Sequence, residues 1–174
     1  MDDRPVIVVG VDESAGSRAA LEFAIADAGR RNARVRVVSV FPLPEYGPTV
    51  YGSGAYRMET TPTLEQLTTG IEQSVQCMVR EVVAEQGSAV AGLPVDVQAL
   101  PGAPAKVLLE QARRADLLVV GHRGRGGFAS AILGSVGLQC VLHAPCPVTV
   151  VRPAPQPVPE ESPAVAAAVV PVPL

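Results

Sequence analysis

Aromatic residues and lysine are the scarcest components of this chain of 174 residues. Trp is absent and aromatic residues make up only 3% of the chain, whereas 48% of its residues are hydrophobic. The core is therefore expected to consist of Val, Leu, Ile and Ala. Lys106 is the only lysine, and no G-x-x-x-x-G-K-[ST] sequence occurs, which excludes a Walker A phosphate-binding loop.

An excess of positive charge is also missing. The formal net charge of −3 and the pI near 5.4 provide no general basic field for nucleic acid. Four arginines do cluster, but they surround a predicted helix end and the strand that follows it, where cations complement the helix dipole. They are Arg30, Arg31, Arg34 and Arg36.

The chain lacks paired cysteines and long apolar runs. It has three cysteines, Cys77, Cys140 and Cys146, and no C-x-x-C pair, so neither a disulfide framework nor a zinc site is predicted. Unpaired cysteines are typical of a reducing compartment. No apolar core of a signal sequence opens the chain, and no apolar run approaches the length of a membrane span. We therefore expect a cytoplasmic protein without a membrane partner or a nucleic-acid partner.

The most informative feature present is a glycine-rich stretch that follows a short apolar run. Leu117–Val120 is predicted to be a buried parallel strand, because it is a continuous apolar run that ends at a glycine. The stretch from Gly121 to Gly124 comes next, and Gly134-Ser135 follows after nine further residues. Glycines just past a strand let the backbone turn sharply and approach a ligand closely. Together with Gly126-Gly127, they form a loop that can direct several N–H groups at one anion.

A second anion-binding element is expected where a helix begins at Gly134-Ser135. The first N–H groups of a helix have no partner within the helix, so they and the Ser135 hydroxyl can bind a phosphate oxygen. Two anion-binding turns after a single strand predict a polyphosphate ligand.

Hydrophobic periodicity predicts five strands that alternate with four helices. The strands are expected at Val6–Val11, Val35–Phe41, Val95–Leu100, Leu117–Val120 and Val148–Val151. The helices are expected from Ser14 or Ser17 to Gly29–Asn32, from Thr61-Pro62 to Gly87, from Pro104 to about Arg114, and from Ser135 to about His143. Helical crossovers of this length join parallel strands, and right-handed crossovers predict an open, doubly wound α/β fold: a five-stranded parallel sheet with helices on both faces.

The chain is expected to divide into one domain, residues 1–153, and a tail, residues 154–174. The tail is rich in Pro and Ala and has no turn-bounded element, which is typical of a disordered segment with a polyproline II bias. A short docking peptide is the alternative, because Ala164–Val170 is apolar. A long surface loop is expected between Pro42 and Pro62.

The glycine spacing, together with the sequence on either side of it, resembles the ATP-binding branch of the universal stress protein family. The pattern is Gly121-x2-Gly124-x9-Gly134-Ser135-Val136, followed by the block from His143 to Arg152. Near the N-terminus, Ile7–Ser14 is similar to the opening strand of that family and to its adenine-side aspartate, here Asp12. The likeness covers about residue 5 to Arg152.

The resemblance implies strand order 3-2-1-4-5, which places an ATP site past the carboxyl ends of strands one and four, where the winding reverses. It also implies that main-chain atoms of Val40 lie against adenine. A divalent metal, Mg²⁺ or Mn²⁺, would be carried by the nucleotide, and no resident metal site is predicted. The binding residues that the resemblance implies are Val11, Asp12, Val40, Val120, Gly121, Gly124, Gly134, Ser135 and Val136.

Each candidate residue has a structural alternative that the sequence leaves open. Asp12 and Ser135 belong to residue types that cap helices, and the glycines could serve only a tight connection. Arg123 and Arg125 flank Gly124, where they could pair with phosphates or remain solvated loop charges.

Two residues depart from the family pattern. His122 stands where family members often carry a small hydroxyl residue, so its side chain could either crowd or contact the ligand. Gly137 lies in the first turn of the last helix, which it weakens by about 1 kcal/mol relative to Ala.

The sequence therefore predicts an ATP-binding module rather than a dedicated catalyst. No general base for the γ-phosphate and no Ser-His-Asp set can be picked out, so any hydrolysis is expected to be slow. The short apolar strand Val148–Val151 is expected at a sheet edge, and it predicts a homodimer. One alternative is a nucleotide-free dimeric interaction module of the same fold. Another is an adenylate-forming enzyme, which would need an S-G-G-x-D-S or H-I-G-H type motif, and neither occurs.

Overall fold

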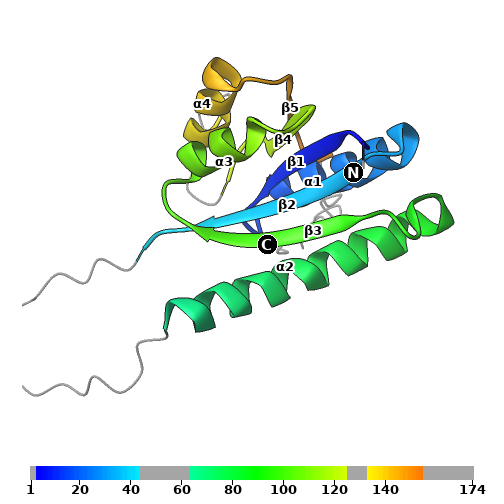
Figure 1. Cartoon of the computed structure of the whole chain (residues 1–174), viewed down its shortest axis with the longest axis horizontal. Coiled ribbons are helices and arrows are strands. Elements are labelled where there is room, and N and C mark those ends of the chain that lie inside the picture. Colours follow the sequence, from blue (N-terminus) through cyan, green and yellow to red (C-terminus); the bar gives the residue numbers. More distant parts are fainter. Residues whose placement is uncertain (1–2, 44–62, 125–132, 155–174) are drawn as a thin grey trace, which may run out of the picture.

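Five parallel strands form one sheet in the order β3-β2-β1-β4-β5 (Figure 1). A computed structural model describes residues 3–43, 63–124 and 133–154. The strands are β1 (Val6–Val11), β2 (Arg34–Phe41), β3 (Val95–Pro101), β4 (Leu117–Gly121) and β5 (Val148–Val151). The helices are α1 (Ala15–Arg31), α2 (Leu64–Gln86), α3 (Pro104–Ala112) and α4 (Ser135–His143), with a 3₁₀ turn, η1 (Gly87–Val90), after α2. The predicted doubly wound α/β fold and its strand order are confirmed.

The central strand β1 pairs with β2 on one side and with β4 on the other, so that Ile7 lies beside both Val35 and Leu117. Side chains alternate between the two faces of the sheet. Those on one face, among them Val9, pack against α1 and α2, and those on the other face, among them Val8, pack against α3 and α4. Both faces are fully covered at β1, which explains why this strand is an unbroken apolar run.

Helix α1 begins after Ser14, whose hydroxyl accepts a hydrogen bond of 3.1 Å from the backbone N–H of Ser17. This interaction decides between the two serines that the sequence offered as caps. The helix ends at Asn32, which adopts a left-handed conformation with φ 51°. Its buried face consists of small and branched apolar residues that are completely enclosed: Ala20, Leu21, Ala24, Ile25 and Ala28.

Helix α2 begins later than the predicted Thr61-Pro62. Thr63 is its N-cap, and it forms a capping box with Gln66: Gln66 N–H donates to Thr63 Oγ1 over 3.2 Å, and Thr63 N–H donates to Gln66 Oε1 over 2.9 Å. The two reciprocal bonds satisfy N–H groups at the start of the helix that have no partner within it. The predicted end is confirmed, because Gly87 is the C-cap with φ 72°. Pro62, most of the expected loop and all but the first residue of the expected tail lie outside the described residues.

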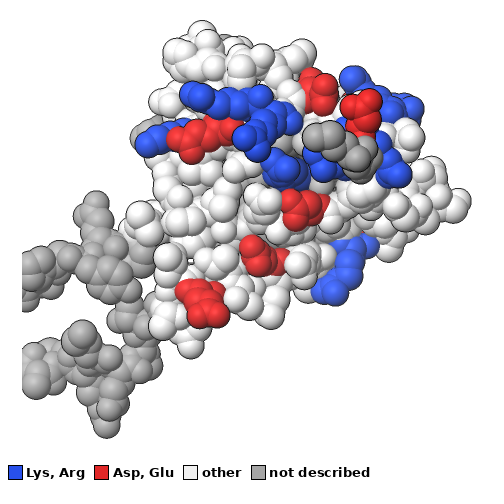
Figure 2. Space-filling view, in the orientation of Figure 1, with Lys and Arg blue, Asp and Glu red and all other residues white. Residues whose placement is uncertain are grey.

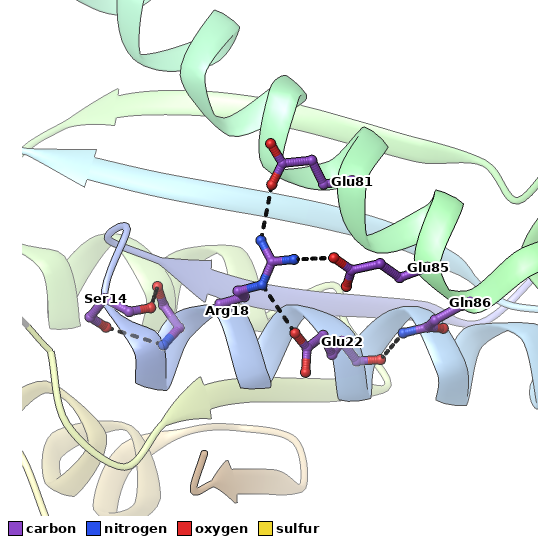
Figure 3. A network of polar contacts seen from close by, with 7 residues as sticks. Ser14, Arg18, Glu22, Glu81, Glu85 and Gln86 are labelled. Atoms are coloured by element: carbon purple, nitrogen blue, oxygen red, sulfur yellow. Dashed lines mark hydrogen bonds and ion pairs between the residues drawn. The ribbon is translucent and has the colours of Figure 1, made fainter. Parts of the chain in front are cut away.

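Helix α2 is fastened to α1 by Arg18 (Figure 3). Its guanidinium donates to Glu81 over 3.1 Å and to Glu85 over 2.7 Å, both on α2, and its Nε lies 3.2 Å from Glu22 on α1. The hydrogen bond to Glu81 is the largest of the interactions that raise the pKa of Arg18. The carboxylates are exposed, so the network orients the two helices more than it stabilises the fold. In the described part of the chain, no helix combines the length and the apolar character needed to cross a bilayer.

Candidate functional site

A cleft of about 570 Å³ opens past the carboxyl ends of β1 and β4, and we call it the carboxyl-end cleft. The chain winds away from β1 in both directions here, since β2 lies on one side of it and β4 on the other. All nine residues that the sequence singled out line this cleft: Val11, Asp12, Val40, Val120, Gly121, Gly124, Gly134, Ser135 and Val136. Seven further lining residues were not predicted as ligand contacts: Gly10, Ser17, Val38, Pro104, Leu108, Leu133 and Gly137.

One wall of the cleft is the turn between β1 and α1. Asp12 Oδ1 accepts hydrogen bonds from Ser14 Oγ over 2.6 Å and from Ser14 N–H over 3.2 Å. The suggestion that Asp12 itself caps α1 is therefore wrong, because Ser14 is the cap and Asp12 holds Ser14 in place. The half-buried carboxylate of Asp12 borders the cleft at the same time.

Glu13 ties this turn to α2. It adopts a left-handed conformation with φ 62°, which is uncommon for a residue other than glycine. Its Oε1 accepts a hydrogen bond of 2.7 Å from Ser74 Oγ, halfway along α2. The contact joins residues 61 positions apart. No local sequence signal marks either residue, and the sequence analysis missed both.

Two glycines allow the start of α1 to lie directly on the end of β4. A Cβ atom at Gly121 would lie 2.6 Å from the carbonyl carbon and 2.7 Å from the carbonyl oxygen of Gly16. A Cβ atom at Gly16 would lie 2.5 Å from the carbonyl oxygen of Arg123. Both contacts are with backbone, which cannot rotate away as a side chain can. Gly121 is thus required by packing within the protein, and Gly16 is its unpredicted counterpart.

The other two glycines of the pattern differ in what surrounds them. A Cβ atom at Gly124 would overlap Oδ2 of Asp12, so glycine at this position leaves room for the carboxylate. At Gly134 the nearest atoms, in His122 and Arg123, would be 3.5 Å away, which is an ordinary contact. Packing among the described residues therefore accounts for Gly124 but leaves Gly134 free to carry a small side chain.

Helix α4 begins at the cleft with its N–H groups uncapped by any side chain of the described residues. Gly134 is the N-cap, and Ser135 is the first helical residue, so the suggestion that Ser135 is the cap is wrong. The residues from Gly134 to Gly137 all line the cleft. Because the first N–H groups of a helix lack partners within it, this end offers donors and a positive dipole end to an anion.

Gly137, the second departure from the family pattern, has a packing reason. It is buried, and a Cβ atom there would lie 3.0 Å from Cδ1 of Leu133 and 3.6 Å from the carbonyl oxygen of Gly121. Glycine therefore brings the first turn of α4 close to the end of β4, at the cost in helix propensity that the sequence predicted.

The opposite part of the cleft is apolar. Val38 and Val40 come from β2, and Pro104 and Leu108 come from the first half of α3. Leu108 reaches over the sheet because Gly10 has no side chain: a Cβ atom at Gly10 would lie 2.9 Å from Leu108 Cδ1. The cleft thus joins an apolar region suited to a flat ring with a region of backbone N–H donors suited to anions.

Arg123 lines the cleft, whereas Arg125 lies outside the described residues. His122 is not among the lining residues, so its side chain neither crowds nor contacts this space. Its Nδ1 is buried without a hydrogen-bond partner, and this burial lowers the pKa of the imidazole, as do the nearby charges of Arg123 and Arg152. Among the described residues, no group of three or more His, Cys, Asp or Glu side chains could hold a metal ion.

Comparison with known proteins identifies related sequences. The model of the universal stress protein family matches residues 4–152. A universal stress protein of Mycobacterium tuberculosis is 33% identical over 156 residues, which cover 87% of this chain and 49% of that protein. One of Thermus aquaticus is 33% identical over 150 residues, which cover 84% of this chain and 97% of that protein. The chain spans about half the length of the mycobacterial relative.

Solved structures share the fold. A universal stress protein in complex with cAMP is 24% identical with a TM-score of 0.57, and the match covers 87% of this chain and 98% of that one. The universal stress protein of Archaeoglobus fulgidus in complex with dAMP is 22% identical with a TM-score of 0.53, and the match covers 86% of this chain and 98% of that one.

Proposed function

Since this chain belongs to the universal stress protein family, we propose that it binds an adenine nucleotide, ATP above all, in the carboxyl-end cleft. The observation that carries this proposal is the uncapped start of α4, which borders the same cleft as the apolar region from β2 and α3. An anion site next to an apolar wall matches a ligand that joins phosphate to a flat base. The position past the carboxyl ends of β1 and β4 is where doubly wound sheets bind nucleotides.

Each part of the ligand has a proposed partner. The adenine ring would lie against Val40 and Pro104, near main-chain atoms of β2. Asp12 would accept a hydrogen bond from the sugar or the base, because its Oδ2 is directed toward Gly124 at the edge of the cleft. The phosphates would receive N–H donors from the first turn of α4, and Arg123 would add a positive charge.

Two neighbours of the same fold, solved with cAMP and with dAMP, support an adenine nucleotide as the ligand class. Among adenine nucleotides we favour ATP, because two candidate anion-binding segments, at Gly121–Gly124 and at Gly134–Gly137, border one cleft and suit a polyphosphate. A Mg²⁺ or Mn²⁺ ion would arrive with the phosphates. Binding is the proposed activity, and hydrolysis would be slow.

A charge placed at Ser135 tests the proposal without disturbing the fold. Ser135 is exposed at the first position of α4, where Asp suits the helix dipole, so Ser135→Asp is expected to keep the stability of the free protein. The same carboxylate would repel phosphate. We expect ATP affinity, measured by calorimetry, to fall at least tenfold, which corresponds to about 1.4 kcal/mol. Ser135→Asn, similar in shape but neutral, is the matched control.

The wild-type protein supplies the reference. ATP at a hundred times its Kd should raise the free energy of unfolding by about 2.7 kcal/mol. For a domain of this size, that is a rise of about 5–10 °C in Tm. GTP should act less strongly if Asp12 and Val40 contact the base. Equal ATP affinity in Ser135→Asp and Ser135→Asn would contradict the proposed phosphate site. A wild-type protein without any Tm shift or co-purified nucleotide would overturn the function.

A nucleotide-free dimeric interaction module remains the second candidate, and α4 provides the observation that favours it. Leu138, Val141 and Leu142 are 48%, 49% and 65% exposed, and α4 contacts the edge strand β5. We propose that two copies pair through β5 and this face, since an open strand edge invites pairing across a two-fold axis. Light scattering should give a dimer at micromolar concentration. A monomer there would refute the pairing.

The three unpaired cysteines support a cytoplasmic location.

A further inference from the structure

A second cavity, of about 300 Å³, lies at the opposite end of the sheet, where β1, β2 and β3 begin. We call it the amino-end cavity, and its charged lining residues are Arg34, Arg36 and Asp96. Basic side chains gather over α3 and over this end of the sheet, with acidic residues between them (Figure 2). The cavity is therefore charged, unlike the apolar part of the carboxyl-end cleft.

The two arginines of the cavity are incompletely paired. Nε of Arg34 and Nε of Arg36 are both buried without a hydrogen-bond partner. Arg36 donates from Nη1 to Gln111 Oε1 over 3.1 Å, but its Nε is 3.7 Å from Asp96 Oδ2, too far for a hydrogen bond. For Arg34 no side-chain hydrogen bond or ion pair occurs within the described ranges. Asp116 accepts a hydrogen bond of 2.7 Å from the backbone N–H of Val6, which lines the cavity.

The neighbouring arginines show that this lack of partners is local. Arg30 and Arg31, in the last turn of α1, both pair with the buried carboxylate of Asp27, at 3.1 and 2.7 Å. The helix-dipole interpretation therefore suits these two. It does not apply to Arg34 and Arg36, which lie on β2 and whose half-buried side chains line a cavity.

Enclosing part of a guanidinium without a partner costs free energy, so a binding role is a good physical reason for its presence. Arg34 and Arg36 are two residues apart on one strand and so lie on the same face of the sheet, about 6.4–6.8 Å apart along it. A carboxylate carries a single negative charge and, as Asp27 does for Arg30 and Arg31, gives one oxygen to each of two guanidinium groups. A tetrahedral oxyanion directs its oxygens apart and can carry two negative charges, which suits two separate guanidinium groups.

We propose that the amino-end cavity binds a phosphate-type oxyanion between Arg34 and Arg36, at a site separate from the carboxyl-end cleft. Asp96 competes with this anion for Arg36. Removing the Asp96 charge should therefore strengthen binding, whereas removing the Arg34 charge should weaken it at least tenfold. The site does not depend on nucleotide binding, because the two cavities lie at opposite ends of the strands.

The test is a titration of the ¹⁵N-labelled full chain with inorganic phosphate, against chloride at equal ionic strength. Amide shifts locate the anion, so binding near Arg34 and Asp96 is distinguished from binding at the start of α4. We expect Arg34→Gln to weaken the first site at least tenfold and Asp96→Asn to strengthen it. Arg30→Gln, which removes an arginine paired with Asp27, should leave it unchanged. Shifts only at α4, or equal loss in Arg30→Gln and Arg34→Gln, would overturn the proposal.

Stability in phosphate-free buffer separates a ligand site from a structural arginine. If Arg34 is retained for an anion, Arg34→Gln should keep or raise the Tm without phosphate and lose the rise in Tm that phosphate produces. A lower Tm without phosphate, together with an unchanged response to phosphate, would show that Arg34 serves only the fold.

Discussion

The contact between Gly16 and Gly121 leads to a quantitative prediction about stability. In Gly121→Ala the new methyl group would lie 2.6–3.0 Å from three backbone atoms, the carbonyl carbon and oxygen of Gly16 and the nitrogen of Ser17. Because these atoms belong to the first turn of α1, the helix must shift as a body to make room. In Gly134→Ala the nearest atoms would be 3.5 Å away, so no shift is needed.

The expected magnitudes follow from these distances. Overpacking of this kind lowers the free energy of unfolding by about 1–3 kcal/mol. Because the atoms that Gly121→Ala would contact belong to the backbone and cannot rotate away, we expect a loss of about 2–3 kcal/mol for this variant. At about 2–4 °C per kcal/mol, the Tm should fall by roughly 4–12 °C. Gly134→Ala replaces one N-cap residue by a poorer one at an ordinary backbone conformation, φ −68° and ψ 156°, and should cost at most about 1 kcal/mol.

Thermal and urea unfolding of both variants without ligand measure this difference. The double variant Gly16→Ala/Gly121→Ala adds a further check, because both methyl groups open the same gap and their costs should sum to less than the two single values. The packing account would be refuted if Gly121→Ala were as stable as the wild type, or if Gly134→Ala lost as much stability as Gly121→Ala.

Two further predictions concern pH and helix capping. His122 has a lowered pKa in the folded protein, so below its ordinary value of 6.5 the unfolded chain takes up a proton first. The free energy of unfolding should therefore fall as the pH drops from about 6.5 through the lowered pKa, and His122→Asn should flatten this part of a pH series of urea unfolding. If the free energy of unfolding of His122→Asn depended on pH as steeply as that of the wild type, this role of His122 would be refuted. Thr63→Ala removes the capping box of α2 and should cost about 1 kcal/mol, a Tm decrease of about 2–4 °C by calorimetry; no decrease would mean that the box contributes nothing.

The amino-acid sequence was sufficient to predict which segments form helices and which form strands. The bounds of β1, α4 and β5 agree with those predicted, because continuous or periodic apolar runs and capping residues are local signals. The strand order came from the resemblance to a family, and the same resemblance indicated nine residues that line one cleft. Where a stronger local signal was overlooked, as with Thr63 and Gln66, the predicted start of α2 was wrong by two to three residues.

Only the tertiary structure decided why particular residues are needed. Gly16 and Gly121 come together because β1 and β4 pair in the sheet, and their closeness depends on the packing of α1 rather than on any local pattern. The same holds for Glu13 and Ser74, and for the incomplete pairing of Arg34 beside the paired Arg30 and Arg31. A sequence states which charges and glycines exist, whereas their partners are set by distances between segments that only the folded chain brings together.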